Sequence, residues 1–235
     1  MNNVLVILTT TVTVNNYKCF LYQKDPNERI NTYIKSIKQW LEKTNLKICV
    51  VENSGYTFPE LKDYLKIYED RFEIITFDEI KHPPELQHYV YNNSKGASEL
   101  YAINYAYYNS KFNSSTEFII KITGRYFIDS LEGFLQKHNL SKRCDQISVC
   151  NDGNRLVALR QNNNIRCEIV GCHKMLIPII FNTTMNDSDG NFHTHVEFLY
   201  QNRINLINDK HILKCDEFDI EPTPMGGNNE IINML

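Results

Sequence analysis

The sequence lacks the features that mark several common classes of protein. Its 235 residues carry a formal net charge of only −3, so no basic excess favours non-specific binding of nucleic acid. The seven cysteines include no C-x-x-C pair, which argues against a zinc knuckle or a dithiol redox motif. They are interpreted as free thiols of a reducing compartment. Internal repeats, heptads and low-complexity linkers are also missing.

A long apolar segment is missing as well. Residues 1–14 have no basic n-region, are interrupted by threonines, and are too short to span a bilayer. With 42% apolar and 23% charged residues, the composition is typical of a globular protein. We therefore expect a cytoplasmic protein without a transmembrane segment, and the length suits a single domain.

The first half of the chain alternates two hydrophobic patterns. Short, nearly continuous apolar runs indicate strands that are covered on both faces, whereas residues 29–43 keep the spacing of an amphipathic helix. Strands are expected at 4–8, 46–51, 72–77 and 118–122, and helices at 29–43, 59–68 and 95–108. This alternation predicts an α/β, Rossmann-like domain with a mostly parallel central sheet flanked by helices.

The second half is less regular. Residues 130–138 are expected to form a helix, and short strands are expected at 147–149 and 155–159, joined by a turn at 151–154. Residues 196–200 fit either a helix or a strand, and residues 222–227 are expected to form a loop.

Polar residues follow three of the expected strands. The first strand runs into Thr9 and Thr10, the second into Glu52 and Asn53, and the fourth into Thr123-Gly124-Arg125. The carboxyl ends of the strands are where α/β proteins bind their ligands. These side chains are therefore candidate binding residues.

The expected helix at 95–108 opens with Lys95 and Gly96. A glycine at a helix entrance admits a ligand or another segment of the protein, and a helix N-terminus favours anions. On these two residues alone, a capped core helix is the simpler interpretation.

Taken together, this order of parts resembles the GT-A glycosyltransferases. Gly96 and Asn104 fall close to the spacing of a G-x-x-x-x-x-N helix motif of that family. Where the family's fourth strand ends in a metal-binding D-x-D, this chain has K-x-T-G-R-Y, residues 121–126. That sequence is similar to a variant in glycosyltransferase-like proteins of bacterial surface-polysaccharide clusters and large DNA viruses.

The resemblance implies one GT-A-like domain over 1–235, with a nucleotide-sugar-binding half at 1–128 and an acceptor-binding half at 129–235. It implies a UDP- or GDP-linked sugar donor, a glycan or small acceptor, and no required cofactor. The implied donor-binding residues are Thr9, Thr10, Glu52, Asn53, Lys95, Gly96, Lys121, Thr123, Gly124 and Arg125. Lys121 and Arg125 would supply the charge of the absent metal to the leaving diphosphate. The alternative for these two cations is an ion pair at the strand end.

An inverting transfer, which the resemblance favours, needs a carboxylate that takes the acceptor's proton. Glu197 is the candidate base and Asp189 the second choice, because the family places this group late in the chain. His193 and His195 near Glu197 fit a polar acceptor wall or a weak metal motif. Further cations that could reach phosphate, or simply be solvated, are His173, Lys174, Arg160 and Arg166.

A literal D-x-D stands at Asp187-Ser188-Asp189, in a turn-rich loop. It is the second choice for a metal site, with Mn²⁺ or Mg²⁺, and would suit a metal-dependent nucleotidyltransferase. A non-catalytic nucleotide- or glycan-binding module is the other alternative. The tail at 224–228 is expected either to donate N–H groups to the diphosphate or to be a disordered end.

Overall fold

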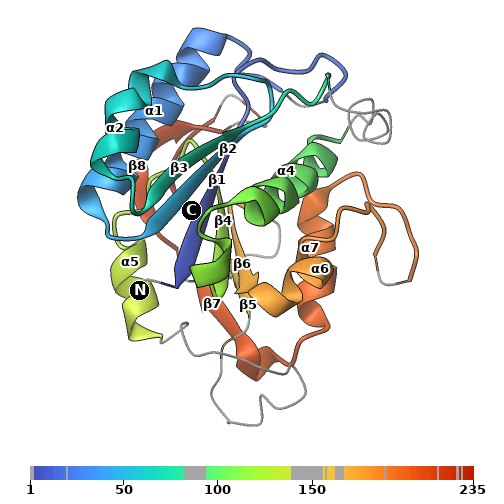
Figure 1. The fold of residues 1–235 in the computed structure, drawn as a ribbon. Coiled ribbons are helices and arrows are strands. Elements are labelled where there is room, and N and C mark those ends of the chain that lie inside the picture. Colours follow the sequence, from blue (N-terminus) through green and yellow to red (C-terminus); the bar gives the residue numbers. More distant parts are fainter. Residues whose placement is uncertain are drawn as a thin grey trace.

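A computed structural model describes residues 3–19, 21–81, 94–138, 156, 158–161, 167–187, 189–215, 217–225, 228 and 230–235. Strands and helices alternate through the first half (Figure 1), in the order β1 (Val4–Thr10), α1 (Pro26–Lys43), β2 (Lys47–Glu52), η1 (Pro59–Leu61), α2 (Lys62–Ile67), β3 (Phe72–Thr76), α4 (Lys95–Asn109), η3 (Asn113–Ser115) and β4 (Phe118–Thr123). The second half contributes α5 (Leu131–Lys137), β5 (Ala158–Gln161), β6 (Ile169–His173), η5 (Lys174–Leu176), α6 (Ile177–Ile180), α7 (Val196–Asn205), η6 (Asp209–His211), β7 (Ile212–Cys215), β8 (Asp219–Pro224) and β9 (Ile231–Met234). None of the helices described is both long and apolar enough to cross a membrane.

The central sheet has seven strands in the order β3-β2-β1-β4-β6-β5-β7. β1 pairs in parallel with β2 and β4, β2 with β3, and β5 with β7. Only β6 runs antiparallel to its two neighbours, β4 and β5. The prediction of an α/β fold with a mostly parallel central sheet is therefore confirmed.

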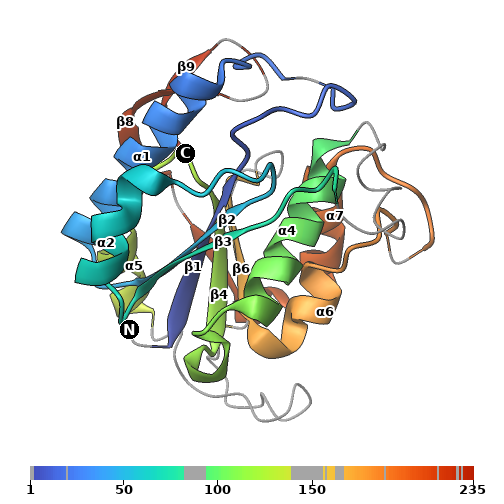
Figure 2. The same ribbon diagram turned by 45° about the horizontal axis from the view of Figure 1, so that its top comes forward.

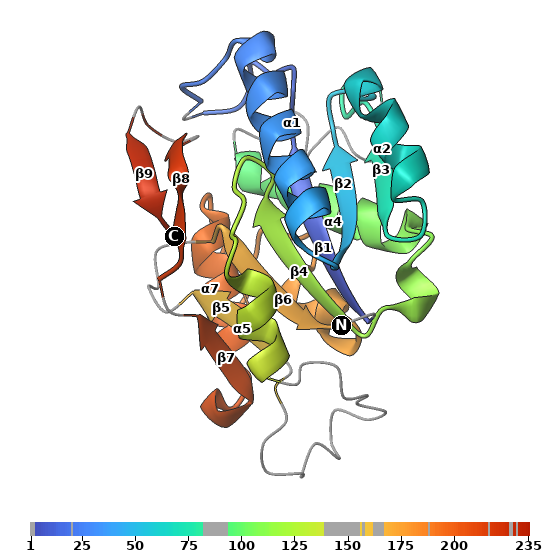
Figure 3. The same cartoon turned by 90° about the vertical axis from the view of Figure 1, so that its left-hand side faces the viewer.

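Both faces of the sheet are covered by helices, as Figures 2 and 3 show. One apolar core joins alternate β1 residues to α1 and α5, with Trp40 and Leu135 among its members. The other core joins the remaining β1 residues to α4, α6 and α7, with Leu100 and Leu199 among its members. Because successive side chains of a strand point to opposite faces, the continuous apolar run of β1 serves both cores.

The direction in which the sheet grows reverses between β1 and β4. From β1 the chain adds β2 and then β3 on one side, and then returns to place β4 on the other side of β1. In open α/β sheets such a reversal leaves a crevice at the carboxyl ends of the two strands, where ligands bind.

Most expected elements lie where the pattern places them, with a few differences. α1 begins at Pro26 because the Asp25 carboxylate caps the amides of Asn27 and Glu28. β5 is Ala158–Gln161, and residues 155 and 157 of the strand expected there, the expected strand at 147–149 and the turn at 151–154 lie outside the described residues. Residues 196–200 are helical.

The expectation of a tail loop starting at residue 222 is wrong. Residues 222–224 belong to β8, which pairs antiparallel with β9; we call this pair of strands the hairpin. The hairpin lies beside α1 (Figures 2 and 3), where Glu221 forms an ion pair with Lys35 and accepts a 2.8 Å hydrogen bond from Gln39 Nε2.

Candidate active site

A cavity of about 340 Å³ opens where β1 and β4 end. Of the predicted site residues, those in its wall are Thr9, Thr10, Asn53, Lys95, Gly96, Thr123, Arg125 and Glu197. The switch point of the sheet thus brings together most of the residues singled out at the strand ends.

The turn after β4 is fixed by two backbone hydrogen bonds. Tyr126 N donates to Thr123 O at 3.0 Å, and Gly124 N donates across to Thr9 O at 2.9 Å. A Cβ atom at position 124 would lie 2.6 Å from Thr10 Cγ2 and 2.8 Å from Thr9 O. Glycine is therefore required because the ends of β1 and β4 touch here, and Arg125 follows at the cavity wall.

Arg125 shares this side of the cavity with a second guanidinium, that of Arg29 on α1. The Nε of Arg125 is buried and has no hydrogen-bond partner among the described residues. Arg29 is only 4% exposed, and its guanidinium donates to Gln23 O at 2.9 Å and to the Tyr33 hydroxyl at 2.7 Å. Burial lowers the pKa of Arg29, and the charge of Arg125 lowers it further. An anion bound between the two would relieve that repulsion.

Glu52 lies behind the cavity wall instead of in it. Its fully buried carboxylate accepts bonds from three backbone amides, those of Val12 at 2.8 Å, Ser54 at 2.9 Å and Tyr56 at 2.8 Å. Burial raises the pKa of this carboxyl even though these hydrogen bonds lower it. Glu52 thus ties the loop after β1 to the loop after β2, and any effect on a nucleotide would be indirect.

Asn53 does reach the cavity, within a hydrogen-bonded chain. Its Oδ1 accepts from Thr11 Oγ1 at 2.6 Å, and its Nδ2 donates to Glu79 Oε2 at 2.9 Å. Glu79 Oε1 in turn accepts from Asn15 Nδ2 at 3.2 Å. Glu79 and Asn15 line the cavity but were missed from the sequence, since neither belongs to a motif.

Lys121 is fully buried beneath the cavity and faces protein partners. Its Nζ lies 2.9 Å from Glu99 Oε1 and donates to Cys167 O at 2.8 Å. Burial lowers the pKa of Lys121, but the charge of Glu99 opposes this and the net shift is upward. The structure therefore favours the ion-pair interpretation of Lys121 over contact with a diphosphate, whereas Arg125 stays in the cavity wall.

Gly96 allows close packing between the first turns of α4 and α7. A Cβ atom there would lie 2.5 Å from Val196 Cβ and 2.9 Å from its Cγ1. The glycine thus lets the start of α7 approach the start of α4, and this contact brings Glu197 to the cavity. Lys95, the exposed first residue of α4, stands at the cavity wall beside it.

Carboxylates gather on the side of the cavity formed by α4, α7 and the segment before β6. These are Glu99, Glu168 and Glu197. Glu197 Oε1 lies 3.6 Å from the Cys167 thiol, whose pKa is raised well above its usual value by burial. Glu168 Oε2 is buried, with no hydrogen-bond partner in the described part of the chain. Glu168 was missed from the sequence because it lies in a stretch without a clear pattern.

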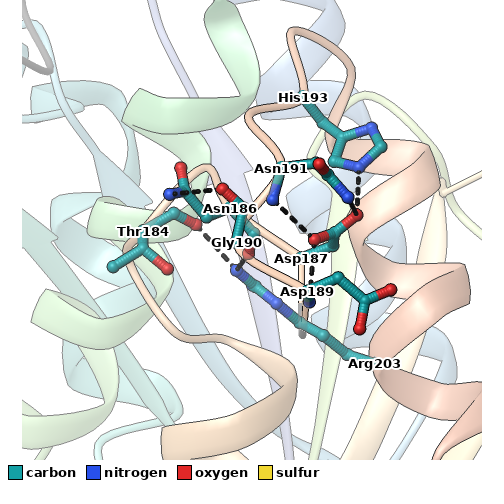
Figure 4. Close-up of polar contacts among 8 residues, drawn as sticks. All are labelled: Thr184, Asn186, Asp187, Asp189, Gly190, Asn191, His193 and Arg203. Atoms are coloured by element: carbon teal, nitrogen blue, oxygen red, sulfur yellow. Dashed lines mark hydrogen bonds and ion pairs between the residues drawn. The ribbon is translucent and has the colours of Figure 1, made fainter.

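The literal D-x-D loop lies outside the cavity wall, and Figure 4 shows its contacts. Both oxygens of the Asp187 carboxylate are occupied: it accepts from Asp189 N at 3.0 Å, Asn191 N at 2.8 Å and Asn191 Nδ2 at 3.2 Å, and His193 Nε2 lies 2.8 Å away. The bond to His193, followed by those to the Asn191 and Asp189 amides, lowers the pKa of Asp187 to about 2. These are the contacts of a self-organised acidic turn.

The segment that leads into this loop is fixed by hydrogen bonds from Arg203 of α7. Its guanidinium donates to four carbonyl oxygens, those of Ile180, Asn182, Thr184 and Asn186, at 2.7–3.3 Å. Asp189 is exposed on the outside of the loop, and Ser188 lies outside the described residues. Within the described ranges, no three His, Cys, Asp or Glu residues are grouped so that they could hold a metal ion.

The other candidate cations lie elsewhere. Glu117, which precedes β4 at the opposite end from the cavity, contacts both His173 and Lys174. Arg160 donates to Asn205 Oδ1 at 3.4 Å. From the tail, Met225 and Asn228 do line the cavity. Arg166, Gly226 and Gly227 lie outside the described residues.

Comparison with known proteins finds similarity to solved structures. No protein-family model and no curated protein matches the sequence. A crystal structure from Desulfovibrio desulfuricans G20, described as a "putative nucleotide-diphospho-sugar transferase", is similar with a TM-score of 0.45 and 12% identity, over 92% of this chain and 80% of that chain. The likeness concerns the arrangement of the backbone alone.

Proposed function

We propose that this protein transfers a sugar from a nucleotide-diphospho-sugar to a hydroxyl group of a glycan or small acceptor. The observation that carries the proposal is the cavity at the switch point of the sheet. Its wall holds the guanidinium groups of Arg29 and Arg125 and, on the side of α4 and α7, the carboxylates of Glu99 and Glu197. This division suits a reaction in which an anionic group leaves while a proton is removed elsewhere.

The diphosphate is assigned to the side of Arg125 and Arg29. Sugar transfer leaves negative charge on the departing diphosphate, and a guanidinium can meet two phosphate oxygens at once. Arg125 follows directly after β4, has an unpartnered Nε within the described structure, and stands beside a second positive charge. We propose that these two cations take the place of a metal ion, so that transfer is metal-independent.

The acceptor is assigned to Glu197, in the first turn of α7. The acceptor oxygen attacks the anomeric carbon, the carbon–oxygen bond to the diphosphate breaks, and Glu197 takes the acceptor's proton. The nucleoside diphosphate leaves with the electron pair of the broken bond. A single displacement of this kind inverts the anomeric centre.

The nucleoside is assigned to the far end of the cavity, at the hydrogen-bonded chain of Asn53, Glu79 and Asn15. Because these amide and carboxylate side chains are hydrogen-bonded to one another, their donors and acceptors have fixed positions for contact with a nucleobase. A uracil or guanine nucleotide is the proposed ligand of this end.

A thermal-shift panel tests the proposal without knowledge of the acceptor. UDP, GDP and their sugar derivatives are added separately, each with EDTA and with Mn²⁺. We expect one base series to raise the melting temperature equally under both conditions. A shift seen only with Mn²⁺ would contradict the metal-free mechanism and favour a metal-dependent nucleotidyltransferase, and no shift at all would contradict the proposed function.

The Arg125→Ala variant extends the same assay to the anion site. Its binding free energy for the nucleoside diphosphate is expected to be less favourable by about 1.5–3 kcal/mol, the range of a hydrogen bond to a charged group. Lys214→Ala, which removes a partly exposed cation on β7 outside the cavity, serves as the matched control. A wild-type affinity of Arg125→Ala would exclude this residue from the site. Ligand binding without any transfer or hydrolysis would favour a binding module.

A further inference from the structure

Three carboxylates gather on one part of the cavity wall, which is unexpected in a site proposed to bind an anionic donor. Glu99, Glu168 and Glu197 all reach the cavity there. Each is linked to the short segment before β6. Glu168 belongs to it, Glu197 lies 3.6 Å from the Cys167 thiol, and Glu99 shares the Lys121 ammonium with Cys167 O.

Two ammonium groups lie on this side of the cavity. That of Lys121 is fully buried and held by Glu99 and Cys167 O, and that of Lys95 belongs to the exposed first residue of α4, in the cavity wall. Arg29 and Arg125 lie on the side of α1, with Tyr33 and Tyr126 around them. Three carboxylates against two ammonium groups leave this part of the wall with excess negative charge.

The Glu168 carboxylate has one oxygen without a hydrogen-bond donor in the described structure. Its Oε2 is withdrawn from water and accepts no hydrogen bond from the residues described. Leaving a carboxylate oxygen without a donor is costly. Its backbone is fixed as well, because Glu168 O accepts a 3.2 Å bond from Thr123 N in the same turn region as Arg125. The backbone of Glu168 is therefore held next to the turn that carries Arg125.

Resting on the proposed function, we propose that the donor sugar is uncharged and that its hydroxyl groups donate to Glu168 and Glu99. A sugar bound through its diphosphate to Arg125 brings its ring hydroxyls to the acidic side, where carboxylates accept hydrogen bonds from them. A uronic acid keeps its ring hydroxyls but carries a carboxylate in place of the CH₂OH group. That carboxylate cannot donate a hydrogen bond and is repelled by Glu168, so this wall selects neutral sugars over acidic ones.

Two donors that differ at one carbon test the proposal. UDP-glucose and UDP-glucuronate share base, diphosphate and ring, and differ only in CH₂OH against carboxylate. GDP-mannose and GDP-mannuronate serve in the same way if the guanine series binds. Calorimetric titration in EDTA is expected to give a Kd at least about tenfold weaker for the uronate, a difference of about 1.4 kcal/mol.

The Glu168→Gln variant tests whether Glu168 causes the preference for the neutral sugar. It removes the charge and keeps the size, so the preference for the neutral sugar is expected to fall at least about threefold. Affinity for the nucleoside diphosphate alone is expected to stay unchanged. Asp189→Asn, which removes a carboxylate outside the cavity, is the control and is expected to keep the full preference.

Equal affinity for the neutral and acidic sugars, or a preference that survives Glu168→Gln, would overturn the inference. In either result the nucleoside diphosphate still binds, so the proposed function stands. Absence of binding by every nucleotide and nucleotide sugar would overturn the proposed function, and this inference with it.

Discussion

Replacing Lys121 with methionine should damage stability more than nucleotide binding. The change removes a fully buried ammonium that lies 2.9 Å from Glu99 and donates to Cys167 O. Methionine retains most of the packing volume, so electrostatics dominate the loss. Breaking a buried ion pair costs about 3–5 kcal/mol. Because the Glu99 side chain keeps 20% exposure, its stranded charge is partly hydrated. We therefore expect the lower end of that range, about 3 kcal/mol.

Urea unfolding at neutral pH measures this loss, which corresponds to a fall in Tm of about 6–12 °C for a domain of this size. The pKa of Lys121 is raised in the folded state, so its contribution is present below the unfolded pKa and lost only as pH rises through the higher folded value. The loss should therefore be the same at pH 6 and pH 8. Lys214→Met removes a cation from an exposed pair with Asp209 and should cost less than about 1 kcal/mol.

A double variant isolates the pair itself. Adding Glu99→Gln to Lys121→Met removes the stranded charge, so the double variant should regain part of the stability that Lys121→Met loses. A Lys121→Met variant as stable as Lys214→Met would refute the reasoning. So would an additive double variant, because it would show that the two side chains do not interact energetically.

Three other predictions use different parts of the structure. Glu197→Gln should leave donor binding intact and abolish transfer, and unchanged turnover in a product assay would remove it as the base. Gly96→Ala should lose about 1–3 kcal/mol in urea unfolding by overpacking against Val196, whereas Gly133→Ala, whose Cβ meets no described atom within 4 Å, should gain about 0.5–1 kcal/mol. The pKa of Asp187 is lowered to about 2 from 3.8, so its contribution to loop stability is present above pH 4 and lost as pH falls toward 2. Amide exchange of the loop should show this loss, and Asp187→Asn should remove it; a wild-type pH profile in that variant would contradict the assignment.

The sequence was most informative where one pattern dominated. β1, β2 and β4 are covered on both faces, and their sequences are therefore nearly continuous apolar runs. Those runs were enough to identify them as strands of a parallel sheet. The position of Arg125 followed, because a polar turn after a buried strand must lie at the edge of the sheet.

Contacts between distant residues could not be predicted in this way. Lys121 looked like a ligand-binding cation because its partner Glu99 lies on another element, and only the packing of α4 on the sheet brings them together. Arg29 is hidden at the start of an amphipathic helix, although its spacing to Tyr33 and Ile37 places it on the buried face and could have signalled its role. The short strands β6 and β7 carry too few residues for a periodic pattern.

The contact between the ends of β1 and β4 also bears on how sequences of this fold can diverge. One of the two atoms nearest to a Cβ at position 124 is the carbonyl oxygen of Thr9, which no side-chain substitution can remove. Selection for the sheet alone would therefore preserve Gly124. Arg125 bears no such constraint from the backbone. Its protein contacts are with the side chains of Tyr33 and Tyr126, so selection for an anionic ligand would be the stronger reason to preserve it. A lineage that kept the fold and lost the chemistry should retain the glycine and let the arginine drift.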